Sequence, residues 1–265
     1  MEEITFFGNK MYNNASVIMG DFLFNGNTIT CNGSGIYVNK FHDVSSDMHN
    51  STAVTIGNIT FNGNTITITS SDNGMYLHLY DFGINNDATA SFSLGELLMD
   101  GNTILNAEYG IYFYETDNFT ISNNEIMDGD HGIYLDGSSN NTVVWNTIVN
   151  NTAGATGAHV NELSNDNELD LNCFYDNVPY QAVDNGTNNT FSSNFYSDYA
   201  GTGPYLIEGT ANNSDNNPLD ECPVGGAPAV IERVPAVTPL GLIALVGVLS
   251  AVLGMRIRRR DKKEE

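Results

Sequence analysis

The sequence is poor in basic residues, and most of those it has lie at one end. Seven of the nine Lys and Arg lie at or after Arg233, so residues 1–232 contain only Lys10 and Lys40. The same stretch contains 29 Asp and Glu and therefore carries a formal charge of −27. Such a surface repels nucleic acid, which argues against phosphate binding. It is typical of an acidic exterior or of adaptation to salt, and it leaves a cation-binding surface open as a function.

Cysteine is scarce as well. The three residues Cys31, Cys173 and Cys222 are too few for a disulfide scaffold, although Cys173 and Cys222 are able to pair near the end of the folded part. The odd number leaves at least one thiol without a partner in the chain. The apolar content of 41% is enough for a substantial core, which excludes a disordered chain.

The N-terminus has no export signal, because its first residues lack a basic start followed by an apolar stretch. Residues 1–15 instead resemble the middle of a repeat. The C-terminal end nevertheless predicts an exported chain. We therefore expect the signal and the first repeats to be missing from this sequence.

An uncharged apolar run of about 18 residues extends from Thr238 to Met255, and a basic cluster follows at once. The run is at the short end of what spans a bilayer, and the basic cluster and the chain end argue against a buried core helix. The positive-inside rule places Arg256–Lys263 in the cytoplasm and residues 1–230 outside. The predicted segments are a linker over 223–237, a single transmembrane helix over 238–256 and a basic cytoplasmic tail over 257–265.

This tail resembles the C-terminal sorting and anchoring signals of prokaryotic surface proteins. Those signals combine a short Pro-containing motif, a hydrophobic helix and an Arg-rich end, which are matched here by Val234–Pro239, the apolar run and Arg258–Arg260. In such signals the helix can be removed and replaced by a lipid. A retained helix and a cleaved one both remain open for this chain.

Most of the chain consists of repeats of an Asn-rich strand followed by a second strand that begins Gly-Ile-Tyr or Gly-Met-Tyr. The four clear copies are residues 24–38, 61–77, 99–113 and 121–135. A fifth copy begins at 143–152, and its second half degrades. The equivalent isoleucines, at spacings of 37, 38, 22 and 22 residues, are Ile29, Ile66, Ile104, Ile126 and Ile148.

A 22-residue period of short alternating strands is that of one coil of a parallel β-helix. We therefore predict an all-β chain, with a right-handed parallel β-helix over 1–190 and a closing segment over 191–222, followed by the single transmembrane helix. The isoleucines should point into a narrow core, and Asn at the coil corners should form hydrogen-bonded ladders. The longer early spacings predict loops at about 40–53 and 81–90, where function is often placed.

Tyrosine recurs at one position of the repeat and should form an external stack on one sheet. The four residues are Tyr37, Tyr76, Tyr112 and Tyr134. A stripe of this kind suits contact with carbohydrate, although the preference of aromatic residues for strands explains it equally well.

The repeats and the closing segment together resemble the NosD-like, pectin-lyase-like β-helix proteins common on archaeal cell surfaces. In the closing segment, Asn194–Tyr199 matches the family's Asn-Tyr-Trp-Ser-Asp-Tyr motif, with Phe and Tyr in place of Tyr and Trp. Two further family elements are matched by Gly203–Ile207 and Asp215–Leu219. The resemblance covers about residues 16–220. An open β-helix end exposes unpaired strand edges and core side chains, so we expect the closing segment to act as a cap in which aromatic side chains plug that end. The plug residues would be Phe191, Phe195, Tyr196 and Tyr199.

The resemblance to this fold also raises the question of catalysis. Enzymes of this fold that cleave acidic polysaccharides need clustered carboxylates and a basic side chain, and the near absence of Lys and Arg argues against that activity. A glycoside hydrolase with two carboxylates remains the alternative, and its best candidates are Asp128, Asp130 and Asp136. Turn chemistry at a coil corner also favours these residues.

Metal ligands are suggested by His42, Asp47 and His49 in the first long loop and by His78 in the next coil. Copper accepts His and Met, and the family takes its name from a protein linked to copper maturation. The spacing matches no strong ligand motif, and such residues are also common in loops. Weak Ca²⁺ binding by Asp and Asn at the corners is the better-supported cation site, and no other cofactor is expected.

Ten Asn-x-Ser/Thr sequons precede the apolar run and are candidates for N-glycosylation: Asn14, Asn32, Asn50, Asn58, Asn118, Asn140, Asn150, Asn185, Asn188 and Asn212. We predict a non-catalytic cell-surface β-helix that serves in adhesion, envelope structure or glycan contact. Its expected partners are the membrane, surface glycans and other envelope proteins, and not nucleic acid.

Overall fold

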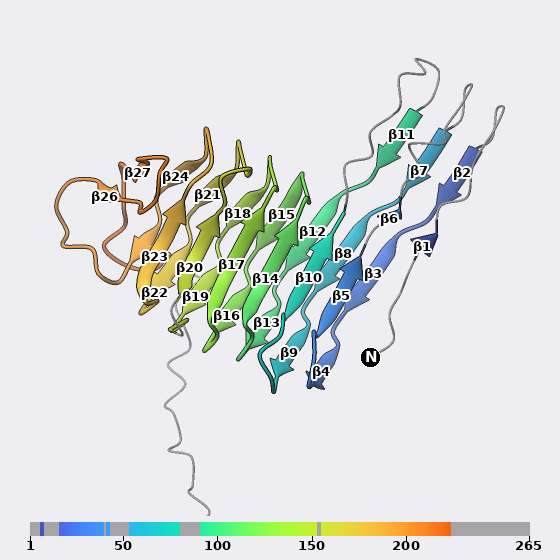
Figure 1. Ribbon diagram of the computed structural model, residues 1–265, viewed down its shortest axis with the longest axis horizontal. Coiled ribbons are helices and arrows are strands. Elements are labelled where there is room, and N and C mark those ends of the chain that lie inside the picture. Colours follow the sequence, from blue (N-terminus) through green and yellow to red (C-terminus); the bar gives the residue numbers. More distant parts are fainter. Residues whose placement is uncertain are drawn as a thin grey trace, which may run out of the picture. The chain divides into compact units, whose positions relative to one another are not determined.

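The structure, a computed structural model, describes residues 6–7, 16–39, 41–42, 53–79, 91–152 and 155–223. All regular elements in these ranges are β-strands, and almost all of them pair in parallel (Figure 1). They lie in one compact unit, residues 1–227. Within the described ranges no helix has the length and apolar character needed to cross a membrane. The predicted transmembrane helix at 238–256 lies outside these ranges.

Three long parallel sheets are built from strands that return once per coil. Sheet 1 contains β3 (Phe22–Asn25), β8 (Ile59–Asn62), β12 (Leu97–Asp100), β15 (Phe119–Ser122), β18 (Thr142–Val144), β21 (Glu168–Asp170) and β24 (Thr190–Ser192). Sheet 2 contains β4 (Thr28–Cys31), β9 (Thr65–Ile68), β13 (Thr103–Leu105), β16 (Glu125–Met127), β19 (Thr147–Val149), β22 (Cys173–Tyr175) and β25 (Phe195–Tyr196). Sheet 3 contains β5 (Ile36–Asn39), β10 (Met75–His78), β14 (Tyr109–Tyr114), β17 (His131–Asp136), β20 (Ala155–Val160) and β23 (Pro179–Asp184).

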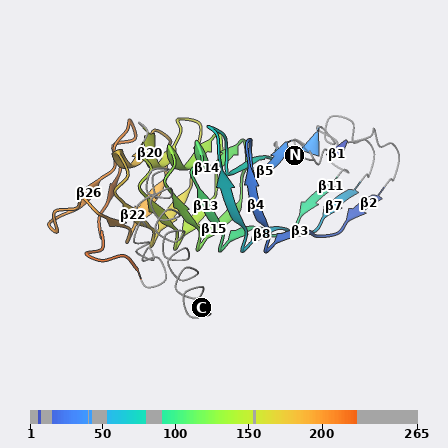
Figure 2. The same cartoon turned by 90° about the horizontal axis from the view of Figure 1, so that it is seen from below.

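The register of these sheets follows the sequence repeat. One strand from each sheet makes a coil, and successive coils lie side by side (Figure 2). The repeated isoleucines pair with one another along sheet 2, from Ile29 through to Ile148, and the last four of them are almost fully buried. The predicted parallel β-helix is therefore confirmed in these residues.

The early coils contain additional strands. The short strands β2 (Ser16–Met19), β7 (Ala53–Ile56) and β11 (Ser91–Leu94) form a fourth parallel sheet, and β1 (Phe6–Phe7) pairs with β6 (Phe41–His42). The expected long loops fall in the same part of the chain. Most of their residues, including Asp47 and His49, lie outside the described ranges.

A ladder of asparagine side chains runs along the corner between sheets 1 and 2. Its members are Asn27, Asn64, Asn102, Asn124, Asn146, Asn172 and Asn194. Each side-chain amide donates to the Oδ1 of the asparagine in the next coil, at 2.8–3.0 Å. Each backbone N–H donates to the same oxygen, for example Asn124 to Asn146 at 3.0 Å. The ladder therefore satisfies buried backbone groups that the corner removes from the sheets.

The ladder between sheets 1 and 2 ends at a buried aspartate, and so does a second asparagine ladder. The first ends where Asn194 donates to Asp215, which is fully buried. A second ladder runs between sheets 3 and 1, through Asn141 and Asn167 to Asn189, and ends where Asn189 donates to Asp184 at 2.8 Å. A carboxylate accepts hydrogen bonds but cannot donate them, so it is a suitable last member.

The C-terminal end of the β-helix is covered by the segment after β25, which includes the antiparallel pair β26 (Tyr205–Leu206) and β27 (Ser214–Asp215). The ring of Tyr196 stacks on the ring of Tyr205, with centroids 3.8 Å apart, and closes the core. Phe191 is also buried, but the prediction for Phe195 is wrong, because its ring stacks on the outward-facing Tyr175 instead. A disulfide between Cys173 and Cys222 joins the segment to sheet 2, as the sequence allowed.

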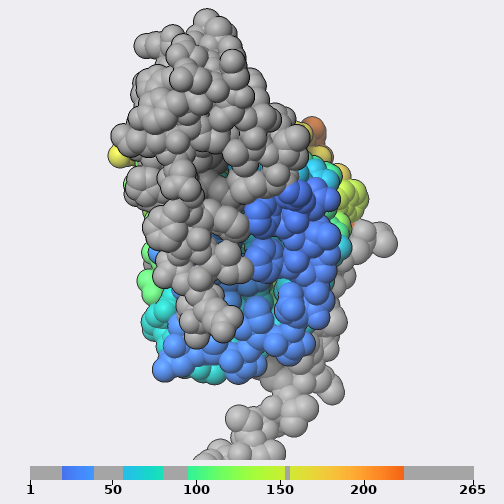
Figure 3. All heavy atoms as spheres, turned by 90° about the vertical axis from the view of Figure 1, so that its right-hand side faces the viewer, coloured from blue at the N-terminus to red at the C-terminus, as the bar shows by residue number. Residues whose placement is uncertain are grey.

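At the N-terminal end of the β-helix, the described core side chains are less deeply buried. Figure 3 looks onto this end and shows atoms of the first described coil in blue. There Phe22, Phe24, Ile29 and Val38 are only partly buried, whereas Ile66 in the next coil is fully buried. The core is therefore less complete at this end of the described residues.

Candidate functional site

The Gly-Ile-Tyr motif explains how tyrosine reaches the surface of sheet 3. A Cβ on Gly110 would lie 2.2 Å from Cγ2 of Ile126 in the next coil, so only glycine fits there. Ile111 then points into the core and is fully buried. Because side chains alternate along a strand, Tyr112 points outward.

The outward tyrosines form a continuous column, as the repeat predicted. Tyr37, Tyr76, Tyr112 and Tyr134 are aligned in register on neighbouring strands of sheet 3. The next strand places His159 at the same position. Successive ring centroids are 4.7, 5.2, 5.3 and 4.7 Å apart along the column Tyr37, Tyr76, Tyr112, Tyr134, His159.

A second, shorter column lies beside the first. The ring of Tyr109 is parallel to that of His131 in the next coil, with centroids 4.6 Å apart, and it also stacks on Tyr112 at 5.0 Å. The ring centroid of His131 in turn lies 6.3 Å from that of His159. We call this surface of sheet 3 the aromatic face, which consists of Tyr37, Tyr76, Tyr109, Tyr112, His131, Tyr134 and His159.

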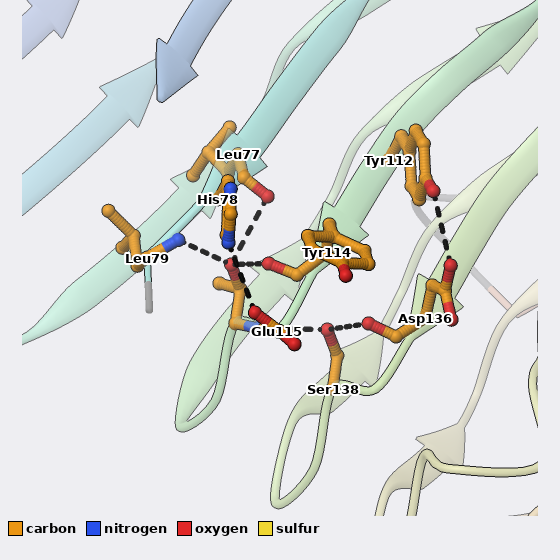
Figure 4. A network of polar contacts seen from close by, with 9 residues as sticks. Leu77, His78, Leu79, Tyr112, Tyr114, Glu115, Asp136 and Ser138 are labelled. Carbon is orange, nitrogen blue, oxygen red and sulfur yellow. Dashed lines mark hydrogen bonds and ion pairs between the residues drawn. The ribbon is translucent and has the colours of Figure 1, made fainter. Parts of the chain in front are cut away.

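Carboxylates flank the aromatic face where the strands of sheet 3 end (Figure 4). Asp136 accepts hydrogen bonds from the hydroxyl of Tyr112 at 3.2 Å and from the side-chain amide of Asn161 at 2.9 Å. Glu115 lies one coil earlier and contacts Nε2 of His78 at 3.2 Å. The aromatic rings therefore lie beside negatively charged groups.

Burial and these carboxylates shift the titration of the rings. Burial, and then neighbouring tyrosines and the charges of Asp136 and Glu115, raise the pKa of Tyr76 to about 12. Burial and Asp136 likewise raise the pKa of Tyr112. Burial and the nearby His159 lower the pKa of His131 to about 4. Near neutral pH Tyr76, Tyr112 and His131 are therefore uncharged, and the charge beside them is negative.

One comparison identifies the fold family. The family profile described as "Right handed beta helix region" matches residues 82–230, which is more than half of the chain. The chain belongs to this right-handed β-helix family. No curated protein and no solved structure matches it.

This β-helix separates Asp136 from the other two aspartates that were candidates for catalysis. Asp128 lies at the corner before β17, where it accepts a hydrogen bond from Asn150, and Asp130 directly precedes β17. Asp136 is at the other end of that strand. A strand rises about 3.3 Å per residue, so Asp130 and Asp136 lie about 20 Å apart. Paired carboxylates in glycoside hydrolases lie about 5–9.5 Å apart, so Asp136 is not placed to work with the other two.

Of the four candidate metal ligands, only His78 has a side chain that the structure describes. His78 is buried in β10 and contacts Glu115. His42 belongs to β6, and Asp47 and His49 lie outside the described ranges. Among described residues, no group of three or more His, Cys, Asp or Glu is arranged to hold a metal ion. Binding of Ca²⁺ at the corners stays a prediction.

The predicted glycosylation sites differ in their surroundings. Five of these asparagines are exposed: Asn32, Asn118, Asn140, Asn188 and Asn212. Two others are partly buried and donate their side-chain amide to a neighbouring group: Asn150 and Asn185. Asn58 is partly buried and accepts a hydrogen bond from the backbone of Glu96. Asn14 and Asn50 lie outside the described ranges.

Sequence reasoning missed the histidines and Glu115 as parts of this surface. His159 follows Gly157 and Ala158, so this triplet is the Gly-Ile-Tyr motif with two substitutions. His159 follows Tyr134 by 25 residues, which is close to the 22-residue period of the coils, so this spacing could have indicated its place in the column. Nothing in the sequence pattern indicated Glu115, because it follows the repeated strand at a corner.

Proposed function

We propose that this chain is a non-catalytic β-helix protein displayed outside a cell membrane, where it serves in adhesion or envelope structure. Its aromatic face is the surface that contacts glycans or other envelope proteins. The observation that carries this proposal is the unbroken column of aromatic rings from Tyr37 to His159, across five coils of sheet 3. Tyrosine is well suited to such contacts, because it offers an apolar ring and a polar hydroxyl.

Display outside the membrane is supported by several independent features. Disulfides such as Cys173–Cys222 form and persist mainly in oxidising compartments. The apolar run at 238–256 and the basic residues after it have the pattern of an anchor, retained or exchanged for a lipid. The resemblance to NosD-like proteins of archaeal surfaces and the exposed sequons agree with a surface glycoprotein.

The alternative of a glycoside hydrolase has weaker support. Asp130 and Asp136 lie at opposite ends of β17, which is too far for a catalytic pair. Asp136 is hydrogen-bonded to Tyr112 and Asn161 and so flanks the aromatic face.

The proposal is tested with the full chain in detergent, applied to a glycan array and to isolated cell envelopes. We expect a Tyr112→Leu/Tyr134→Leu variant to lose binding to one of them, because it removes two adjacent rings of the column. Thr120→Ala on sheet 1 is the control and should bind as the unchanged protein does. A reducing-sugar assay is run in parallel. Release of sugar that Asp130→Asn abolishes would establish the hydrolase instead.

A further inference from the structure

In the part of the chain that the structure describes, no Lys or Arg lies beside the aromatic face. The described residues contain no Lys or Arg at all. Asp136, in contrast, accepts a hydrogen bond from the hydroxyl of Tyr112. Two more acidic residues, Glu108 and Asp130, directly precede Tyr109 and His131 in the sequence. Asp136 accepts its two side-chain hydrogen bonds from neutral groups, Tyr112 and Asn161, which leave its negative charge in place.

The titration of the tyrosines supports a negative potential at the rings. After burial, the charges of Glu108, Asp130 and Asp136 raise the pKa of Tyr109. Asp136 has the same effect on Tyr112 and Tyr134. The same field repels anionic ligands and attracts cationic ones.

Aromatic rings beside carboxylates favour one class of cation in particular. A cation over a tyrosine ring is attracted by the electrons of the ring, and a carboxylate nearby adds an ion pair. The guanidinium group of arginine makes both contacts well, because it stacks on rings and forms paired hydrogen bonds with a carboxylate. A neutral sugar can donate a hydrogen bond to Asp136, but it cannot form an ion pair with it.

We propose that the aromatic face binds an Arg- or Lys-rich segment of another envelope protein. The inference rests on the proposed function, since it names the partner of the same face. The argument for this occupant is charge complementarity between a basic segment and a face of rings and carboxylates. The column from Tyr37 to His159 covers four coil spacings of about 4.8 Å, or about 19 Å, which an extended segment of about six residues would follow.

The experiment uses the full chain in detergent and three labelled peptides of the same length: (Arg-Gly)₄, (Gln-Gly)₄ and (Glu-Gly)₄. Binding is measured by fluorescence anisotropy. We expect the arginine peptide to bind and the other two not to bind. Asp136→Asn should weaken binding of the arginine peptide about fivefold or more, because it removes an ion pair beside the rings.

Glu168→Gln is the matched control, because it removes the same charge from an exposed position of sheet 1, on a different face. It should change the affinity less than about twofold. Equal losses from Asp136→Asn and Glu168→Gln would show attraction to net charge alone and overturn the inference. Equal binding of the glutamine peptide would also overturn it.

The outcomes separate this inference from the proposed function. Binding of cell envelopes or array glycans through Tyr112 and Tyr134, without binding of the arginine peptide, would refute the inference and leave the proposed function standing. Binding of the peptide without any binding to the envelopes or the array would support the ligand chemistry and refute the surface role. Failure of both assays would refute both.

Discussion

The glycine of the Gly-Ile-Tyr motif is required by the close packing of neighbouring coils. A Cβ on any of these glycines would lie 2.2–2.4 Å from the Cγ2 of a core isoleucine in the following coil. The four pairs are Gly35 with Ile66, Gly74 with Ile104, Gly110 with Ile126, and Gly132 with Ile148. Glycine thus lets the isoleucine column and the tyrosine column exist in the same repeat.

Gly110→Ala should lower the free energy of unfolding by about 1–3 kcal/mol, because the added methyl group overlaps Ile126 and the backbone oxygen of Gly132. Urea denaturation followed by circular dichroism measures the change. Gly20→Ala is the control, since no atom lies within 4 Å of its added Cβ. It should stay within about 0.5 kcal/mol of the unchanged protein. Similar losses in both variants would contradict this packing argument.

His131 should make stability depend on pH in the acidic range. Its pKa is lowered from 6.5 to about 4 in the folded protein, by burial and by His159. As the pH falls, the unfolded chain therefore binds the proton before the folded protein does. The contribution of His131 to the free energy of unfolding is complete above pH 6.5 and is lost as the pH falls to 4. Urea denaturation across this range should show a shallower pH dependence for His131→Phe, which keeps a ring beside Tyr109. Identical pH profiles would refute the assignment.

At the residue scale, the sequence predicted the isoleucine and tyrosine columns, because both recur at a fixed position. It did not predict the orientation of Phe195. An aromatic residue near the end of a β-helix can face in or out, and the choice depends on strand register, which places Phe195 opposite Cys173 in sheet 2. The role of Asp215 was missed because its partner Asn194 is close only in the folded chain.

The asparagine ladder acts as a structural element in its own right. Asn124 accepts hydrogen bonds from the backbone and side chain of Asn102, at 2.9 and 2.8 Å. It donates to the backbone oxygen of Met99 and to Asn146, at 3.0 and 2.9 Å. All of these polar groups lie in the buried corner, so each depends on the ladder for its partner.

Asn124→Ala should therefore lower the free energy of unfolding by about 3 kcal/mol or more, since it leaves several buried groups without hydrogen bonds. Thermal and urea denaturation report the loss. Asn62→Ala provides the comparison, because Asn62 is exposed on β8, two residues before the ladder member Asn64. We expect a change within about 0.5 kcal/mol there. An equally mild effect of Asn124→Ala would show that the ladder contributes little.

At the element scale, the 22-residue period predicted the strands of the regular coils. It did not predict β20 and β23, whose sequences depart from the Gly-Ile-Tyr pattern. These strands form because the strand of the preceding coil offers a complete set of hydrogen-bonding groups, whatever the local sequence. The fourth sheet of β2, β7 and β11 was missed for a different reason, since its strands lie next to irregular insertions.

The molecule as a whole is strongly acidic, and salt should stabilise it. Residues 1–232 carry a formal charge of −27, so the folded chain repels itself. The Debye length falls from about 10 Å at 0.1 M salt to about 3 Å at 1 M, which screens this repulsion. The midpoint of thermal unfolding should therefore rise with NaCl over this range. KCl should act equally, and a midpoint that stays constant or falls would contradict the prediction.

The asparagine ladders give the β-helix a direction. An asparagine both accepts from the coil before it and donates to the coil after it, so an extra coil can be inserted between two ladder members without breaking the chain of hydrogen bonds. Asp184 and Asp215 accept but cannot donate. Duplication of a coil within the repeats can thus lengthen the protein, whereas extension beyond these two aspartates cannot continue either ladder. They set the point at which growth of this fold stops.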